Sequence, residues 1–214
     1  MQQYQREFIE FALEHDALRF GSFTLKSGRT SPYFVNTGQF RTGATLAGLG
    51  HFYAAAVAGW DGVRADVLLG PAYKGIPLVA ATAVQLATEF DIDLPWVFNR
   101  KEAKDHGEGG LFVGSEVAGR VLIIDDVVTA GTAIREVIEL VRGTGAEIAG
   151  VVVSVDRQER GTADVSAIQE LSRHYGIEVR AIVTMSDIVD YLEETSRFAE
   201  YLPAMREYRA TYGV

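Results

Sequence analysis

The chain has 214 residues, which is enough for one α/β domain with a sizeable core but cramped for two. Its formal net charge of −9 at pH 7 argues against a general nucleic-acid binder, although it leaves room for a local basic patch. The absence of cysteine excludes disulfides, thiolate catalysis and cysteine-ligated zinc. Residues 1–10 lack a signal-peptide pattern, and the longest weakly polar stretch, 45–60, is too short to cross a bilayer. We therefore expect a single cytoplasmic domain over residues 1–214, with no nucleic-acid or membrane partner.

The N-terminal part of the chain is expected to hold a helix and a hairpin. Apolar residues at helical spacing predict the helix: Phe8, Ile9, Phe11, Ala12 and Leu13. In residues 18–36, aromatic residues alternate with polar or small ones around turn chemistry at 26–32. This pattern predicts an antiparallel hairpin appended to the main sheet.

Helices and strands then alternate along the chain. Short apolar or β-branched runs predict strands at 67–69, 96–98, 121–124, 148–155 and 179–184. Helices are expected at about 45–59, 77–90, 132–142 and 164–175, with one or two more at the C-terminal end. This alternation predicts an α/β fold with a central, mainly parallel sheet and helices on both faces. In such sheets ligands bind beyond the carboxyl ends of the strands, where residues 70–75, 125–132 and 156–157 fall.

Residues 121–132, VLIIDDVVTAGT, are the most informative stretch. An apolar run ends in Asp125 and Asp126, and a turn rich in Thr, Ala and Gly leads to Thr132, which is expected to cap a helix. Backbone amides in such a turn and the helix N-terminus form an anion site, and carboxylates beside it suit hydroxyl groups or Mg²⁺. The pattern favours a site for a phosphorylated ribose over an ordinary acidic strand end.

A long polar loop is expected over residues 99–114. Arg100, Lys101, Lys104 and His106 gather in it, and glycines that permit backbone movement follow. Mobile cations of this kind can close over a polyanionic leaving group such as pyrophosphate and exclude water. We favour a catalytic lid over a solvated surface loop.

Other candidate residues stand in turns or at strand ends. Lys26 is in the hairpin turn, where a lone lysine is usually only solvated, and the neighbouring pair Tyr33 and Phe34 is expected to be able to stack on a planar ring. Tyr73 and Lys74 follow a strand, where a phosphate contact and a solvated lysine are about equally expected. Arg157 can hold a carboxylate bidentately or pair with its acidic neighbour.

The sequence contains no Walker loop, dinucleotide fingerprint, His-Glu-x-x-His or EF-hand pattern. We therefore expect Mg²⁺ carried in with phosphate oxygens and no dedicated metal site of the protein. His15, His51 and His174 lie on predicted helices without partner spacing and are expected to be structural.

Residues 121–133 resemble the phosphoribosyl pyrophosphate signature of the type I phosphoribosyltransferases. Further segments resemble the orotate-using members of that family in the form found in enteric-type bacteria: 23–34, 70–77, 98–107 and 156–161. The likeness runs essentially end to end. It implies that residues 1–40 form a hood over the base and that residues 100–114 are a mobile catalytic loop. It also implies transfer of ribose 5-phosphate from phosphoribosyl pyrophosphate (PRPP) to orotate in pyrimidine biosynthesis, with Mg²⁺ and a homodimer that shares its active sites.

The same resemblance implies roles for individual residues. Asp125 and Asp126 would hold the ribose 2′ and 3′ hydroxyls. The 5′-phosphate would lie in the turn formed by Val127, Val128, Thr129, Ala130, Gly131, Thr132 and Ala133. PRPP, mostly through its pyrophosphate, would meet Lys26, Tyr73, Lys74, Arg100, Lys101, Lys104 and His106. Orotate would be bound by Phe34, Val35, Thr129 and Arg157, with Arg157 near its carboxylate.

One departure from the family pattern concerns Val35, because relatives often carry two aromatic residues at the positions of Phe34 and Val35. We expect a backbone contact from Val35 in place of stacking. For catalysis, our hypothesis makes Lys104 the chief stabiliser of the leaving pyrophosphate and His106 a secondary donor or acid, with Asp125 and Asp126 facing the positive charge on the ribose. No general base is identified.

Two other functions compete with this one. A purine-type phosphoribosyltransferase would share the Asp125–Asp126 turn but should lack the Lys26 hairpin and the lid. A regulatory PRPP-binding protein would need a basic RNA face or an added DNA-binding domain, and the net charge and length argue against both.

Overall fold

The structure is a computed structural model that describes residues 1–25, 27–104, 110–128, 131–161 and 164–214, with the backbone alone at residues 103 and 104. The first half contains α1 (Gln3–Glu14), β1 (Leu18–Thr24), β2 (Thr30–Val35), η1 (Thr37–Gln39), α2 (Gly43–Ala58), β3 (Val67–Gly70), α3 (Gly75–Glu89) and β4 (Trp96–Lys104). The second half contains β5 (Gly110–Gly114), β6 (Arg120–Ile124), α4 (Thr132–Arg142), β7 (Glu147–Asp156), α5 (Ala167–Tyr175), β8 (Val179–Thr184), α6 (Met185–Thr195), η2 (Ala199–Tyr201) and α7 (Leu202–Tyr212).

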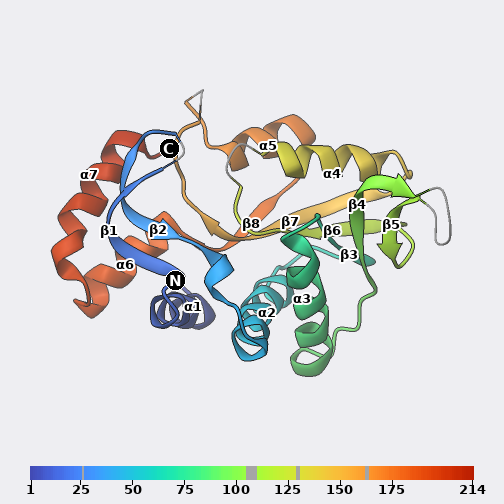
Figure 1. The fold of residues 1–214 in the computed structure, drawn as a ribbon, viewed down its shortest axis with the longest axis horizontal. Coiled ribbons are helices and arrows are strands. Elements are labelled where there is room, and N and C mark those ends of the chain that lie inside the picture. The colour runs from blue at the N-terminus through green and yellow to red at the C-terminus, as the bar shows by residue number, and fades with distance from the viewer. Residues whose placement is uncertain (26, 105–109, 129–130, 162–163) are drawn as a thin grey trace.

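Six strands form the central sheet, in the order β5-β4-β3-β6-β7-β8 (Figure 1). Only β5 is antiparallel to its neighbour, and all other pairs in this sheet are parallel. The α/β fold with a mainly parallel sheet is therefore confirmed. Since a parallel sheet is covered on both faces, its central strands are apolar on both sides, as the buried run from Val121 to Ile124 shows.

Two hydrophobic clusters lie on opposite faces of the sheet. Val121 and Ile123 face the cluster that α4 and α5 cover, whereas Leu122 and Ile124 face the cluster of α1, α2, α3, α6 and α7. Successive side chains of a strand point to opposite faces, so one buried strand contributes to both clusters. Figure 1 shows α4 and α5 above the sheet and α1, α2 and α3 below it. In the part of the chain that the structure describes, we find no helix with the length and apolar content needed to cross a membrane.

The N-terminal hairpin is confirmed as an antiparallel pair of β1 and β2, with a register irregularity between Phe20 and Phe23. It forms its own two-stranded sheet and is not an extension of the main one, which corrects that part of the prediction. Figure 1 places it beside α7 and α6. Buried Tyr33 of β2 packs edge-on against Tyr208 of α7, with ring centroids 6.4 Å apart. The hairpin is therefore held against the rest of the protein by side-chain packing and not by pairing with the central sheet.

The expected polar loop over 99–114 is largely strand. The strand β4 runs on to Lys104 and pairs antiparallel with β5, with Phe98 opposite Val113 and Asn99 opposite Phe112. The first strand is charged over 100–104 and shows no apolar alternation, which concealed it, whereas the apolar run 111–113 in β5 was a strand signal that the prediction overlooked. Residues 105–109, between the two strands, lie outside the described residues.

Candidate active site

The carboxyl ends of β3, β6 and β7 lie side by side, because these strands are neighbours and parallel in the sheet. Each leads into a segment that the sequence singled out: residues 70–75, 125–132 and 156–161. The expected convergence at one edge of the sheet is thus present in the structure.

Asp126 is held on both of its carboxylate oxygens. The Thr37 hydroxyl donates to Oδ1 at 2.5 Å, and Lys74 Nζ donates to Oδ2 at 2.6 Å. Its main-chain oxygen accepts from both the N–H and the hydroxyl of Ser154, each at 2.8 Å. Asp126 is only 8% exposed, so its carboxylate is fixed in one orientation before any substrate arrives.

Asp125 lies beside it in a different environment. The N–H of Asp126 donates to Asp125 Oδ1 at 2.8 Å, and the buried Tyr53 hydroxyl donates to the Asp125 main-chain oxygen at 2.7 Å. Burial raises the pKa of Asp125 to about 6, and the neighbouring Asp126 carboxylate adds to this rise. Asp125 therefore changes its charge close to physiological pH.

The turn after these aspartates surrounds a hollow of about 250 Å³ at the N-terminus of α4. Its lining residues are Asp125, Val127, Val128, Gly131, Thr132, Ala133 and Ile134. The first N–H groups of a helix have no partner within the helix, so an anion in this hollow would meet donors and the positive end of the helix dipole. Thr129 and Ala130 lie outside the described residues.

Thr132 does not cap α4 as the sequence had suggested. Gly131 occupies the cap position in the left-handed conformation, with a φ of 73°, and Thr132 is the first helical residue. The left-handed conformation favours glycine, so the turn provides backbone amides here and no side-chain cap.

The segment between β3 and α3 turns very tightly. A Cβ atom on Gly70 would lie 2.2 Å from the Gly75 main-chain oxygen, so only glycine fits there. The Ala72 N–H donates to Asn99 Oδ1 at 3.0 Å, and the peptide between Ala72 and Tyr73 is cis. This turn leaves Tyr73 exposed and brings Lys74 to Asp126.

The positively charged residues Arg100 and Lys101 of β4 follow Asn99, which is hydrogen-bonded to this turn. Lys101 Nζ is 5.1 Å from the ring centroid of Tyr73, and Arg100 Nη1 donates to the Gly110 main-chain oxygen at 3.2 Å. The structure thus brings Tyr73, Lys74 and Lys101 together near the aspartates. The side chain of Lys104 is not described, and Lys26 and His106 lie outside the described residues.

Arg157 lies between the strand end of β7 and the hairpin. Its Cζ is 4.2 Å from the ring centroid of Tyr33, its Nε donates to Glu159 Oε1 at 2.8 Å, and its Nη2 donates to Ser31 Oγ at 3.1 Å. The guanidinium is therefore fixed by stacking, by an ion pair in which both Nε and Nη2 contact Glu159 Oε1, and by a hydroxyl from the hairpin.

The two hairpin residues Phe34 and Val35 point in different directions. Phe34 stacks on Phe23 with centroids 5.5 Å apart, whereas the Val35 side chain lines an internal apolar cavity. The Val35 side chain thus faces the core.

Residues at the C-terminal end clasp the segment that carries Arg157. The Arg160 N–H donates to the Tyr212 main-chain oxygen at 2.8 Å, and Arg160 Nε donates to the Gly213 oxygen at 2.9 Å. The Val214 N–H donates to the Gln158 oxygen at 3.0 Å. Nothing in the sequence indicated this contact, because it joins residues about fifty positions apart by backbone groups.

Sequence reasoning also missed several side chains that hold the aspartates and the β3 turn: Thr37, Tyr53, Asn99 and Ser154. Ser154 carried a detectable signal, since it is a lone polar residue in the apolar run from Val151 to Val155. Thr37 and Tyr53 reach the site from elements distant in sequence, so periodicity could not place them.

Comparison with known proteins assigns the class. A family model described as "Phosphoribosyl transferase domain" matches residues 42–179, and the chain belongs to this family. The chain is 59% identical, over the full 214 residues of both proteins, to proteins named orotate phosphoribosyltransferase from Pseudomonas syringae pv. tomato and from Vibrio vulnificus. Its structure is similar to that of the orotate phosphoribosyltransferase of Francisella tularensis, with a TM-score of 0.89 and 46% identity over 97% of this chain and 100% of that one.

Proposed function

We propose that this chain transfers the ribose 5-phosphate group of PRPP to orotate, giving orotidine 5′-monophosphate and pyrophosphate, a step of pyrimidine biosynthesis. The observation that carries the proposal is the 59% identity, from end to end, with orotate phosphoribosyltransferases. The resemblance seen in the sequence and the arrangement of the site both agree with it.

The ribose 5-phosphate half of the substrate fits the end of β6. The 5′-phosphate would occupy the hollow at the N-terminus of α4, formed by residues 127–133, and Asp125 and Asp126 would accept hydrogen bonds from the ribose hydroxyls. In a displacement at the anomeric carbon, positive charge develops on the ribose ring as the bond to pyrophosphate breaks. The two carboxylates would stabilise that charge.

The base would lie between the hairpin and the end of β7. Arg157 is already oriented by Tyr33, Ser31 and Glu159, and its guanidinium would bind the orotate carboxylate. Phe34, Thr129 and the backbone of Val35 complete the proposed contacts. Orotate can enter with its attacking nitrogen deprotonated, in which case no general base is required.

The leaving pyrophosphate would meet cations from two elements and the hairpin turn. Tyr73 and Lys74 follow β3, Arg100, Lys101 and Lys104 belong to β4, and Lys26 and His106 are proposed to join them. We assign the chief stabilisation of the leaving group to Lys104. Losing one preorganised donor of this kind costs about 10²–10³ in rate, so Lys104→Ala should lower kcat by that factor.

The donor set of the site fits Mg²⁺ that enters with the substrate. Both oxygens of Asp126 are engaged by Thr37 and Lys74, and among the described residues no group of three or more histidine or acidic side chains could hold a metal ion. Asp126 carries a partner on each carboxylate oxygen, whereas the hydrogen bond described for Asp125 is on Oδ1, so Asp125 is the carboxylate that would more easily approach the ion, with substrate oxygens and water completing its shell. When bound, Mg²⁺ neutralises charge on the pyrophosphate.

We further propose a cytoplasmic homodimer in which residues 100–114 of one subunit reach the active site of the other. Mixing the impaired Lys104→Ala and Asp125→Asn variants under conditions that exchange subunits tests this arrangement. Recovery of activity on mixing supports shared sites, whereas no recovery contradicts them.

The function itself is tested by the loss of orotate absorbance when PRPP and Mg²⁺ are added. Turnover of orotate, with none of adenine, guanine or hypoxanthine, is the expected result. Turnover of a purine base without turnover of orotate would overturn the proposal in favour of a purine-type enzyme.

A further inference from the structure

Thr37 occupies a fixed place between the hairpin and the aspartates. It is the first residue of η1 and is separated from β2 only by Asn36. Both the backbone and the side chain of Asn36 are hydrogen-bonded. The Asn36 N–H donates to the Ala17 oxygen at 2.8 Å, and the Asn36 side chain accepts from the Gly38 N–H at 3.1 Å. The Phe40 N–H donates to the Thr37 oxygen at 3.1 Å, which closes the turn. The Thr37 side chain is therefore placed by its backbone and is only 8% exposed.

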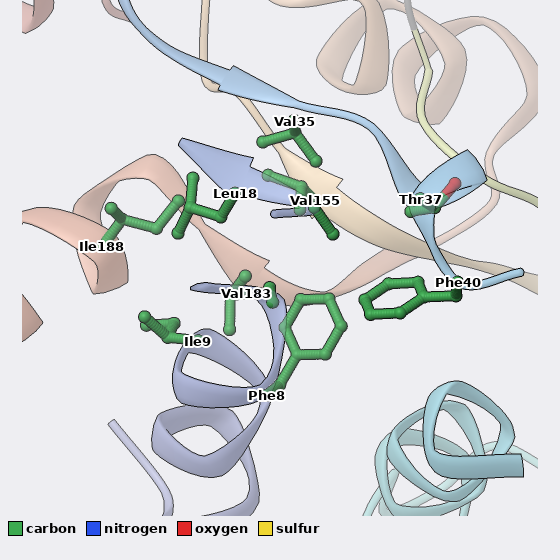
Figure 2. Close-up of a pocket in the computed structure, with 11 residues that line it drawn as sticks. Phe8, Ile9, Leu18, Val35, Thr37, Phe40, Val155, Val183 and Ile188 are labelled. Atoms are coloured by element: carbon green, nitrogen blue, oxygen red, sulfur yellow. The ribbon is translucent and has the colours of Figure 1, made fainter. Parts of the chain in front are cut away.

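The two ends of this side chain face different environments. Thr37 lines an apolar cavity of about 10 Å³ together with residues from α1, the hairpin, β7, β8 and α6, and among the described lining residues it alone is polar (Figure 2). Figure 2 shows its oxygen directed away from Phe8, Leu18 and the other apolar side chains. That hydroxyl donates to Asp126 Oδ1 at 2.5 Å.

The hydroxyl limits what Asp126 can accept from a substrate. An ionised carboxylate offers about four acceptor positions, two on each oxygen. Thr37 occupies one on Oδ1 and Lys74 occupies one on Oδ2. One position on each oxygen remains, which matches a pair of neighbouring hydroxyl donors.

We propose that Thr37 is a positioning residue for the ribose of PRPP, acting through Asp126. This inference rests on the proposed function. By fixing the plane of the Asp126 carboxylate, the Thr37 hydroxyl aims the remaining acceptor positions at the ribose 2′ and 3′ hydroxyls. Thr37 lies within residues 1–40, the proposed hood over the base. Its hydrogen bond to Asp126 therefore also connects the hood to the ribose site.

Two substitutions separate the two ends of the side chain. Thr37→Val keeps the shape and removes the hydroxyl, whereas Thr37→Ser keeps the hydroxyl and removes the methyl group from the cavity wall. Both variants should lose stability: Thr37→Ser by about 2–4 °C in Tm through the lost methyl group, and Thr37→Val through the lost partner of Asp126. Stability thus does not distinguish them, but recognition of the ribose should.

We expect Thr37→Val to raise the KM for PRPP about tenfold or more, since a hydrogen bond to a charged group is lost, with little change in the KM for orotate. Thr37→Ser should retain a KM for PRPP near the wild-type value. Calorimetric titration with PRPP and Mg²⁺ should show the same order of affinities without turnover. The matched control is Thr82→Val in α3, where a fully buried threonine donates to the Leu78 oxygen of its own helix and not to a residue of the proposed site.

A wild-type KM for PRPP in Thr37→Val, or an equal rise in both Thr37 variants, would overturn the positioning role. A rise in Thr82→Val as large as that in Thr37→Val would assign the effect to general loss of packing and would also overturn it. Failure of the wild-type protein to consume orotate would instead refute the proposed function, so the two failures are distinct.

Discussion

Lys74 Nζ lies 2.6 Å from Asp126 Oδ2, so the cation that follows β3 is paired with a carboxylate that follows the neighbouring strand β6. The side chain of Lys74 is 67% exposed, while that of Asp126 is 12% exposed. An ion pair with one such exposed partner is screened by water and is weak. Lys74 can therefore hold Asp126 in the free protein and still turn to an incoming phosphate at little cost.

Replacing Lys74 tests this double role. We expect Lys74→Met to lower kcat/KM for PRPP by about 10²-fold, because both the phosphate donor and a partner of Asp126 are lost. Tm should change little, since the pair is mostly exposed. The control is Arg206→Met on α7, which breaks an exposed pair with Glu193 and should leave kcat/KM unchanged. Equal kinetics for the two variants would contradict the assignment of Lys74.

The raised pKa of Asp125 predicts an acidic limit to activity. Protonation removes the negative charge of Asp125 and turns one of its acceptor oxygens into a donor, which weakens its hydrogen bonds to the ribose and its stabilisation of positive charge, so kcat/KM for PRPP should fall below a pH of about 6. A phosphate monoester also titrates near pH 6, so ionisation of the substrate would produce the same acidic limb in the pH profile of kcat/KM. In Asp125→Asn the residual activity should lose this limb. A limb that persists unchanged in the variant would trace to the substrate.

The same pKa has a consequence for stability. The native state binds the Asp125 proton more tightly than the unfolded chain, whose pKa is near 3.8. The contribution of Asp125 to the free energy of unfolding is therefore most favourable below pH 3.8 and falls as the pH rises to about 6. Asp125→Asn should thus stabilise the free protein at pH 8, by up to about 2–3 kcal/mol, as measured by urea unfolding.

Gly131 should be sensitive to any side chain because of its φ of 73°. A Cβ atom there would meet other atoms no closer than 3.6 Å, so the cost of Gly131→Ala is backbone strain of about 1–2 kcal/mol. Gly145→Ala is the matched control, because Gly145 has a φ of 85° and open space around it. Both variants should lose similar stability, and Gly131→Ala alone should raise the KM for PRPP. A similar KM in both would argue against phosphate binding at this turn.

Arg157→Lys should separate recognition of the base from recognition of PRPP. Lysine keeps the charge but loses the planar fork and the stacking on Tyr33, so we expect the KM for orotate to rise at least about tenfold. The KM for PRPP should stay near wild type. Arg180→Lys provides the control, since Arg180 also stacks on an aromatic ring, that of Trp60 at 4.8 Å, and has no role in the proposed binding of orotate. A wild-type KM for orotate in Arg157→Lys would remove Arg157 from the base site.

The sequence predicted well whatever depends on local pattern. Alternating apolar runs located the strands, and the helix over 132–142 has the predicted bounds. The convergence of residues 70–75, 125–132 and 156–161 also followed, because parallel strands bring their carboxyl ends to one edge. Asp125, Asp126 and Lys74 could therefore be named as neighbours from sequence alone.

What depends on contacts between distant elements could not be predicted in this way. The β4 arm of the 99–114 hairpin was missed because its charged residues show no apolar alternation, and the apolar run 111–113 of β5 was overlooked because it is only three residues long. Thr37 escaped notice because its hydroxyl partner is 89 positions away, and a lone threonine in a turn has many ordinary explanations. The hydrogen bonds from Arg160 to residues 212 and 213 could not be predicted because their acceptors are main-chain oxygens, which every residue carries.

The hydrogen bonds between residues 212–214 and residues 158 and 160 also bear on where a purification tag can be attached. Because Val214 is hydrogen-bonded to Gln158, a purification tag fused after it would begin beside the segment that carries Arg157. A tag fused ahead of exposed Met1 and Gln2 would adjoin α1 instead. Affinity handles for kinetic work therefore belong at the front of this polypeptide.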